Sequence, residues 1–392
     1  MLLRLLVCLA LVALPCNGLN ILLLGGNGLI GGHTSRRLFE AGHRLTSLSR
    51  GSLMWDWNTV LAGHFQQKLR CNRADPLSEC TDFQKMIASR PFFDIVLDFS
   101  GFEQHMIDST VPALKFMFDR YIFISTDSVY EVARTRNHTG PWREQDAVRP
   151  DDYMERRALQ ERDRYAEMKM RCEEQLAAYA KKFNFTAVFL RLPDVLGPRD
   201  STLRLWTYIV AMQIAAAERQ TLQLPNFAPH WQISFVHADD VARVLVLLTN
   251  SNTSGGVWPQ AGGVRALNFA HPETMTLREL LTRLVDHQRL AVATNVVGDP
   301  LAEKPRYLFP SVKNGPIDVT LVRRALKFSF TAWHLALRAS VKFYQQQTAG
   351  LKRGRWPEMR QRLYDSIAYV AVLPHFNEKV WKRYLGMERS EL

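Results

Sequence analysis

The feature that most constrains the fold is a glycine-rich turn directly after an apolar run. Residues 20–24 read Asn-Ile-Leu-Leu-Leu, which predicts a strand buried on both faces. Glycine is needed where a chain turns sharply and where backbone must approach a pyrophosphate, and the N-terminus of the following helix favours anions. The sequence therefore predicts a dinucleotide site in the turn, at Gly25, Gly28, Leu29, Ile30 and Gly31.

Strands and helices alternate along the chain. Further strands are expected at 45–49, 94–99, 121–125 and 186–190, and helices at 104–118, 163–182, 203–218, 239–249, 277–288 and 333–346. This alternation predicts an α/β fold with a Rossmann-type, doubly wound parallel sheet and a smaller C-terminal substrate-binding lobe. We expect a leader at 1–18, a nucleotide-binding domain at 19–192, a substrate lobe at 193–348 interleaved with the last sheet strands, and a basic, aromatic extension at 349–392.

Composition excludes several classes of protein. With 47% hydrophobic and 22% charged residues, the chain can bury a sizeable core, which argues against disordered, collagen-like and disulfide-scaffold proteins. The net charge of +12 could favour a polyanion, a membrane surface or an anionic cofactor. Basic and acidic residues interleave at 155–157 and 161–164, however, so a solvated helical face is the favoured interpretation and nucleic-acid binding the minor one.

The first eighteen residues have the anatomy of a secretory signal peptide. Arg4 precedes ten apolar residues at 5–14, too few to span a bilayer, and small residues precede a cut after Gly18. We therefore expect a protein without an integral membrane span in the secretory pathway, either secreted or kept in the endoplasmic reticulum. Sequons at Asn137 and Asn252 are the expected glycosylation sites, whereas Asn184 leads straight into a strand. The last four residues, 389–392, resemble a degenerate ER-retrieval signal, with chance agreement as the alternative.

Cysteine and histidine spacing indicates no metal site. Removal of the leader leaves Cys71, Cys80 and Cys172, which allow one disulfide at most, and Cys71–Cys80 would close the shortest loop. No Cys-x-x-Cys or Cys/His cluster has the spacing of a zinc site, so no metal is expected.

The end of the second strand bears on cofactor choice. Most NAD sites place an acidic residue there to hold the ribose 2′-hydroxyl. This chain has Ser47-Leu48-Ser49-Arg50-Gly51, and the Arg50 guanidinium could pair with a 2′-phosphate, with Arg36 and Arg37 assisting. The alternative is a solvent-facing arginine. We expect NADP, with NAD as the second choice.

A catalytic set is expected on the long helix and the fifth strand. Tyr165 and Lys169 are four residues apart and share a helix face. A tyrosine titrates near ~10, so its use as a base needs a nearby cation that favours phenolate. A hydroxyl in the segment 125–130 would orient the reacting oxygen at the carboxyl edge of the sheet.

Together these motifs resemble the extended short-chain dehydrogenase/reductases, also called the NAD-dependent epimerase/dehydratase family, from about residue 20 to 344. The resemblance implies that Thr126 is the catalytic hydroxyl beside Tyr165 and Lys169, and that Asp127 is a second acid or base. It places Asp75 at the adenine. It also implies cofactor contacts in the segment after the fourth strand, which holds Phe99 and Ser100, and two further signatures at 190–198 and 235–241.

Departures from the family pattern limit what it implies. In related nucleotide-sugar dehydratases a Glu follows the Thr-Asp pair, whereas Ser128 follows Thr126 and Asp127 in this chain. Many nucleotide-sugar enzymes hold the diphosphate with an arginine just before the second signature, and here Arg204 or Arg265 would have to replace it.

Hydride transfer at a hydroxyl or carbonyl carbon of a sugar-nucleotide-like or other small substrate is the favoured function. Net redox chemistry and epimerisation both remain open, and so does the oligomeric state, for which a homodimer is one option. The alternative is a non-catalytic nucleotide-sensing or RNA/polyanion-binding protein on the same fold, which the basic segment 352–356 would support.

Overall fold

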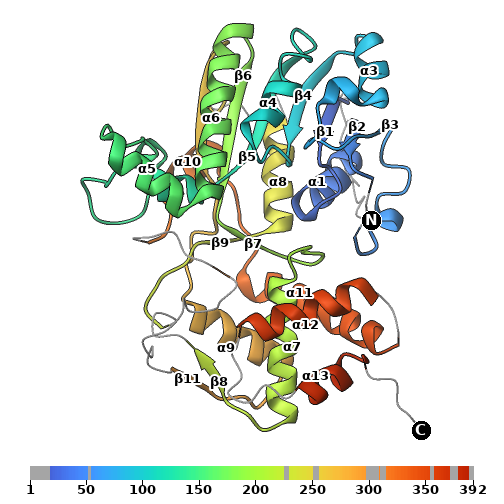
Figure 1. The fold of residues 1–392 in the computed structure, drawn as a ribbon, viewed down its shortest axis with the longest axis vertical. Helices are drawn as coiled ribbons and strands as arrows, with labels where there is room; N and C mark the ends of the chain where they lie inside the picture. The colour runs from blue at the N-terminus through green and yellow to red at the C-terminus, as the bar shows by residue number, and fades with distance from the viewer. Residues whose placement is uncertain are drawn as a thin grey trace, which may run out of the picture.

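The computed structural model describes residues 18–51, 54–224, 229–249, 256–296, 309, 315–353, 357–370 and 378–387. It shows a sheet domain and a helical lobe (Figure 1). The expected leader, the sequon at Asn252 and the C-terminal tetrapeptide lie outside the described residues. Within them, no helix is both long and apolar enough to cross a bilayer.

The central sheet has seven parallel strands in the order β10-β6-β5-β4-β1-β2-β3, so the expected Rossmann-type fold is confirmed. The strands are β1 (Asn20–Leu24), β2 (Arg44–Ser49), β3 (Gln67–Arg70), β4 (Phe93–Asp98), β5 (Phe118–Thr126), β6 (Thr186–Leu192) and β10 (Val264–Asn268). The order reverses between β1 and β4, which is where ligands bind in open α/β sheets.

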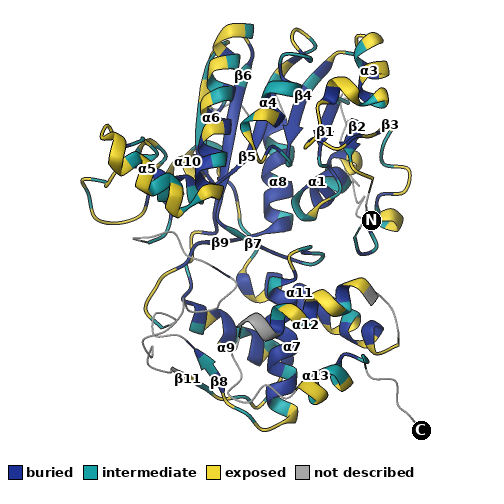
Figure 2. Ribbon diagram, viewed as in Figure 1, coloured by how far each residue is buried: buried dark blue, intermediate teal, exposed yellow. Residues whose placement is uncertain are grey.

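Helices cover both faces of the sheet (Figure 1). The helices of this domain are α1 (Leu29–Glu40), α2 (Trp57–Val60), α3 (Thr81–Ala88), α4 (Gln104–Thr110), α5 (Tyr153–Arg162), α6 (Arg164–Phe183), α8 (Ala238–Thr249) and α10 (Thr320–Leu326). Alternate residues of β1 enter different cores, because Ile21 and Leu23 pack in one cluster and Leu22 and Leu24 in another. The sheet is therefore buried on both faces (Figure 2).

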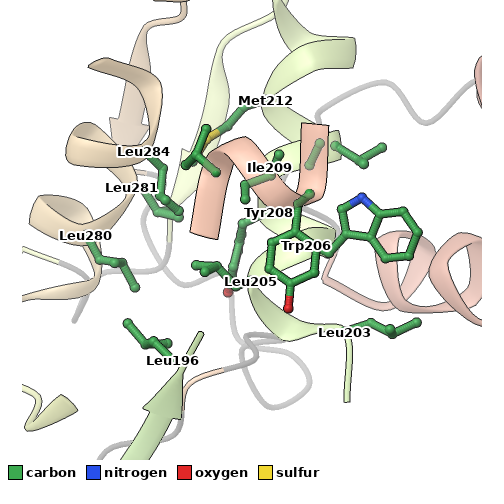
Figure 3. Packing of buried hydrophobic residues seen from close by; sticks show 14 of the residues in the cluster. Leu196, Leu203, Leu205, Trp206, Tyr208, Ile209, Met212, Leu280, Leu281 and Leu284 are labelled. Carbon is green, nitrogen blue, oxygen red and sulfur yellow. The ribbon is translucent and has the colours of Figure 1, made fainter. Parts of the chain in front are cut away.

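The lobe is mostly helical. It contains α7 (Arg204–Ala217), α9 (Leu277–Gln288), α11 (Trp333–Lys352), α12 (Pro357–Val370) and α13 (Glu378–Tyr384), with β8 (Leu222–Leu224) paired to β11 (Thr294–Val296). Its core gathers leucines of α9 against apolar residues of α7 such as Ile209 and Met212 (Figure 3). Met359, Leu363 and Leu385 are buried in the same cluster. The expected boundary at residue 348 falls inside α11, so α12 and α13 complete the lobe's core.

Two short strands, β7 (Asp194–Leu196) and β9 (Phe235–His237), pair in parallel between the domain and the lobe (Figure 1). They correspond to the two signature segments noted in the sequence. The helix expected at 104–118 is shorter than expected, because it ends at Thr110. Pro112 follows, Phe116 has a positive φ of 63°, and β5 already begins at Phe118.

Candidate active site

The glycine turn has the geometry that a dinucleotide requires. Gly25 has a φ of +87°, and a Cβ on Gly31 would lie 2.3 Å from the Gly25 carbonyl oxygen, so neither position tolerates a side chain. At Gly28 a Cβ would meet nothing within 4 Å and would project into open space. The first turn of α1 carries no acidic residue, which leaves its positive end available to phosphates. These residues fit a bound dinucleotide.

A cavity of about 910 Å³ opens beside this turn. Most of the residues expected from the sequence line it: Gly25, Gly28, Leu29, Ile30, Gly31, Phe99, Thr126, Asp127, Tyr165 and Lys169. Ser100 lies next to the turn, because a Cβ on Gly25 would be 2.9 Å from the Ser100 Cβ. One space therefore joins the expected cofactor and catalytic residues.

Helix α6 supplies the tyrosine and the lysine. The helix begins after Asp163, whose carboxylate accepts a hydrogen bond from the Ala166 N–H at 2.9 Å. Lys169 is buried, and its Nζ donates to the carbonyl oxygens of Gly101 at 2.8 Å and Ile124 at 2.7 Å. Burial lowers the pKa of Lys169 to about 8. The ammonium is therefore fixed at the ends of β4 and β5.

Tyr165 projects its hydroxyl toward Thr126. Its surface is 43% exposed, yet its hydroxyl is hydrogen-bonded to Thr126. Burial raises the pKa of the phenol to about 12, while the Thr126 hydrogen bond acts in the opposite direction. At neutral pH the phenol carries its proton and is set to donate it.

Two adjacent hydroxyls at the end of β5 have different environments. Ser125 Oγ donates to Glu173 Oε1 at 2.5 Å, and Glu173 is also held by Arg191 in a buried pair. Both residues line the cavity, but among the described residues Thr126 Oγ1 has no ion-paired carboxylate partner of this kind, and it accepts from the Ser128 N–H at 3.1 Å. Thr126 is therefore the hydroxyl placed to meet a substrate.

Asp127 belongs to a group of acids that the sequence analysis did not bring together. Burial raises the pKa of Asp127 well above its usual value, and the nearby Asp194 adds to this effect. Burial also raises the pKa of Asp194 to about 6, although Arg204 opposes the change. Asp194 and Arg204 form an ion pair at the cavity wall. The segment 190–198 was the only sequence signal for Asp194.

The expected adenosine contacts lie outside the lining of this cavity. Arg50 is exposed at the end of β2, and Asp75 is exposed and accepts from Asn72 Nδ2 at 2.9 Å. A second cavity of about 270 Å³ adjoins the end of β2 and is lined by Ser47, Ser49, Gly51, Lys68 and Arg70, among others. These hydroxyls and cations face the region where Arg50 was expected to act.

Arg36 and Arg37 do not serve the ribose end of the site. The Arg37 guanidinium pairs with the Asp239 carboxylate through both of its oxygens, and Arg36 Nη2 lies 3.4 Å from the same carboxylate. Since Asp239 lies in α8, the two arginines hold α1 against α8. The expectation that they assist a 2′-phosphate is therefore wrong.

The family of the chain follows from its sequence profile. Residues 21–258 match the NAD dependent epimerase/dehydratase family. The chain belongs to this family. The match covers the glycine turn, Thr126, Tyr165 and Lys169, and it confirms the expected family and enzyme type. No curated protein matches the sequence significantly.

Solved structures of similar fold include known members of the family. UDP-glucuronic acid 4-epimerase from Bacillus cereus, in complex with NAD, is 19% identical with a TM-score of 0.60, and the match covers 84% of this chain and 99% of that one. UDP-glucose 4-epimerase from Thermus thermophilus, also with NAD, is 15% identical with a TM-score of 0.61, covering 83% and 99%. dTDP-glucose 4,6-dehydratase from Bacillus anthracis, with NAD, is 15% identical with a TM-score of 0.61, covering 85% and 98%. At these identities the likeness establishes the fold.

The remaining expectations concern cysteines, metal and glycosylation. Cys71 and Cys80 form a disulfide, and Cys172 is a buried free thiol. Among the described residues no group of three or more His, Cys, Asp or Glu side chains could hold a metal ion. Asn137 is exposed in the loop between β5 and α5, whereas Asn184 ends α6 with a φ of 60° and is followed at once by a buried phenylalanine and β6. The basic segment 352–356 is described only as far as Arg353.

Proposed function

We propose that the protein is an NAD(P)-dependent oxidoreductase or epimerase that transfers hydride at a hydroxyl or carbonyl carbon of a small, sugar-like substrate. The observation that carries this proposal is the single cavity shared by the glycine turn, Thr126, Tyr165 and Lys169. A merely structural tyrosine would not need a hydroxyl partner at the carboxyl edge of the sheet. The family supports the same class of chemistry.

Each residue has a distinct role in this proposal. Tyr165 holds or releases the proton of the reacting oxygen at its phenol, and Thr126 orients that oxygen through its hydroxyl. With its pKa raised to about 12, Tyr165 starts as a proton donor, which suits reduction of a carbonyl. Asp127, whose pKa is also raised, can hold a second proton close to the same oxygen. Reduction, oxidation and epimerisation all use this arrangement.

Lys169 acts on Tyr165 through charge and position. Its ammonium lies at the cavity wall and donates to the Gly101 and Ile124 carbonyls. A nearby positive charge favours the phenolate and so assists proton removal in the oxidative direction. A bound oxidised nicotinamide supplies the hydride acceptor and a further positive charge. Lys169 and the cofactor together would offset the burial that raises the pKa of Tyr165.

NADP is the proposed cofactor, with NAD as the second choice. The end of β2 offers Arg50 and no carboxylate, and the adjoining cavity adds Lys68, Arg70 and Ser49. A 2′-phosphate would find hydroxyl donors and cations there. The similar solved structures named above contain NAD, so this preference would distinguish the chain from those proteins.

The secretory pathway is the proposed location. The first eighteen residues support it by their charge, apolar length and cleavage signal. The Cys71–Cys80 disulfide and the exposed sequon at Asn137 are both compatible with an oxidising compartment.

One turnover experiment tests the proposed function. Purified protein is incubated with NADP, NADPH, NAD or NADH and with sugar nucleotides, free and amino sugars, polyols and simple carbonyls. Nicotinamide absorbance reports net redox chemistry, and NMR of the recovered substrate reports inversion at carbon. We expect one of the two signals, lost in Tyr165→Phe. Absence of both across the panel would contradict the proposal.

A further inference from the structure

The charges of the catalytic cavity indicate the class of substrate that it binds. This inference rests on the proposed function. Of the described residues that line the cavity, five are acids and two are bases. The acids are Asp127, Glu131, Asp163, Asp194 and Asp200, and the bases are Lys169 and Arg204. They lie at the carboxyl ends of β5 and β6, at the start of α6 and at the start of α7. Even with Asp127 protonated, as in the role proposed above, and with Glu131 lying 3.4 Å from Arg162, the carboxylates outnumber the cations, so the substrate side of the cavity is formally negative.

Both bases are already bound to protein acceptors. Arg204 pairs with Asp194, its Nε lies 3.6 Å from Asp200 Oδ2, and the same Nε donates to Thr202 Oγ1 at 2.8 Å. Lys169 donates to two backbone carbonyls, as described above. A phosphate would have to compete with these partners for either cation. Arg265, the other arginine considered for a diphosphate, lies in β10 at the edge of the sheet.

The acids also affect one another. Asp127 has a raised pKa because it is buried and because Asp194 and Glu131 lie near it. A second negative group placed among them would add repulsion, which in a partly buried site is several times stronger than in water. A cation in the same place would relieve this repulsion. Trp231, with 52% of its surface exposed, also lines the cavity, and indole rings attract cations.

We propose that the substrate is a small polyhydroxylated molecule carrying an ammonium group, in place of a nucleoside diphosphate sugar. The hydroxyl to be oxidised, or the carbonyl to be reduced, meets Thr126 and Tyr165, while the ammonium group pairs with the acids around Asp127 and Asp194. This class differs from the ligand of another solved structure of the Bacillus cereus epimerase named above, which contains UDP-glucuronic acid and NAD.

Binding measurements on a matched pair of ligands test the inference. The cofactor-loaded Tyr165→Phe protein is titrated with glucamine, with sorbitol, which has a hydroxyl in place of the ammonium group, and with UDP-glucose. We expect glucamine to bind at least about tenfold more tightly than sorbitol, because one modest charge–charge interaction increases affinity by about this factor. Added salt should reduce this ratio. Equal affinities for glucamine and sorbitol, failure of glucamine to bind, or tightest binding of UDP-glucose would overturn the inference.

A charge-removing variant provides a second readout. Asp194→Asn removes one negative charge and releases the Arg204 guanidinium, so it should abolish the preference for glucamine and increase the affinity for UDP-glucose. Asp127→Asn should reduce the glucamine preference without disturbing that ion pair. Asp119→Asn is the matched control, because Asp119 is exposed near the opposite end of β5. Unchanged preferences in both cavity variants would contradict the inference.

These assays separate the inference from the proposed function. They measure binding to a variant that lacks the phenol oxygen of Tyr165, so they do not depend on turnover. If the wild-type protein shows no hydride transfer or inversion while glucamine still binds preferentially, the proposed function fails and the charge preference stands. If turnover is found only with diphosphate substrates, the function stands and the inference fails.

Discussion

Arg73 donates from Nη1 to Asp98 Oδ1 at 2.5 Å, and both side chains are buried where β4 ends. Tyr121 OH donates to the other oxygen of Asp98 at 2.6 Å. Oδ1 also accepts from the Gly101 N–H at 2.8 Å, and the Gly101 carbonyl accepts from Lys169. The Arg73–Asp98 pair therefore orders the segment that links the cofactor turn to the catalytic lysine.

Breaking this pair should destabilise the whole domain. Burial alone would raise the pKa of Asp98, but the charge and hydrogen bond of Arg73 outweigh it and lower the pKa. Arg73→Met leaves that carboxylate buried without its cation, which typically costs ~3–5 kcal/mol of unfolding free energy. Tyr121→Phe, which removes one hydrogen bond to Asp98, should cost only ~1–3 kcal/mol. Urea unfolding of both variants gives the comparison, and equal losses would show that the charge of Arg73 is unimportant.

Local patterns explain why much of the fold and site was predictable. The strand, glycine turn and helix are contiguous, and Tyr165 and Lys169 are one helical turn apart, so no knowledge of distant contacts was needed. Parallel strands also bring their carboxyl ends to one edge, which places Thr126 near that pair. The length expected for the helix at 104–118 was wrong. The helix α4 ends at Thr110, and Pro112 and the left-handed Phe116 follow it.

Contacts that depend on the tertiary fold explain what the sequence could not show. Asp194 meets Arg204 only because β7 leads into α7 at the junction of domain and lobe, and neither residue carries a periodic signal. Arg73 and Asp98 are 25 residues apart and lie in segments whose meeting depends on the sheet order. Arg36 and Arg37 were assigned to the ribose because their partner, Asp239, lies about 200 positions away in the chain.

Tyr165→Phe should abolish catalysis while sparing the fold. The ring of Tyr165 can stay in place, and only the oxygen hydrogen-bonded to Thr126 is lost. A general acid or base contributes ~10²–10⁴-fold in rate, so kcat should fall by at least that range. Cofactor affinity, measured by protein fluorescence, should stay within a factor of about two. Tyr153→Phe, on an exposed position of α5, is the control and should retain full activity.

His33 should make the protein less stable in acid. This buried residue of α1 packs edge-on against Trp57, and burial lowers its pKa from 6.5 to about 4. Between these values the unfolded chain binds a proton that the folded chain does not. The contribution of neutral His33 to the free energy of unfolding is therefore fully present above pH 6.5 and is lost as the pH drops toward 4. The loss is at most about 3 kcal/mol. In His33→Gln, the free energy of unfolding measured in urea should fall less between pH 6.5 and 4 than in the wild-type protein. The same pH dependence in both proteins would assign the effect to another residue.

Expression in a secretory host should yield a glycosylated protein without residues 1–18. Asn137 is exposed in a polar loop, so Asn137→Gln should remove one glycan and increase gel mobility, as enzymatic deglycosylation does. Asn184→Gln should leave the mobility unchanged, because the rest of that sequon is a buried phenylalanine and the first residue of β6. Deletion of residues 389–392 should increase the amount of protein in the medium. A cytosolic protein that retains Met1 would contradict the proposed location.

NADP should bind more tightly than NAD, and Arg50→Asp should reverse the order. The two ligands differ only in the 2′-phosphate, and Arg50 is exposed at the end of β2, where that group would lie. Charge-assisted hydrogen bonds contribute ~1.5–3 kcal/mol each, which corresponds to at least a ~tenfold preference. An aspartate would repel the phosphate and accept a hydrogen bond from the free ribose hydroxyl. Fluorescence titration with both dinucleotides measures the ratio, with Lys115→Asp, an exposed position before β5, as the charge-matched control. Equal affinities in the wild-type protein would show that Arg50 faces solvent, and the proposed cofactor would then be NAD.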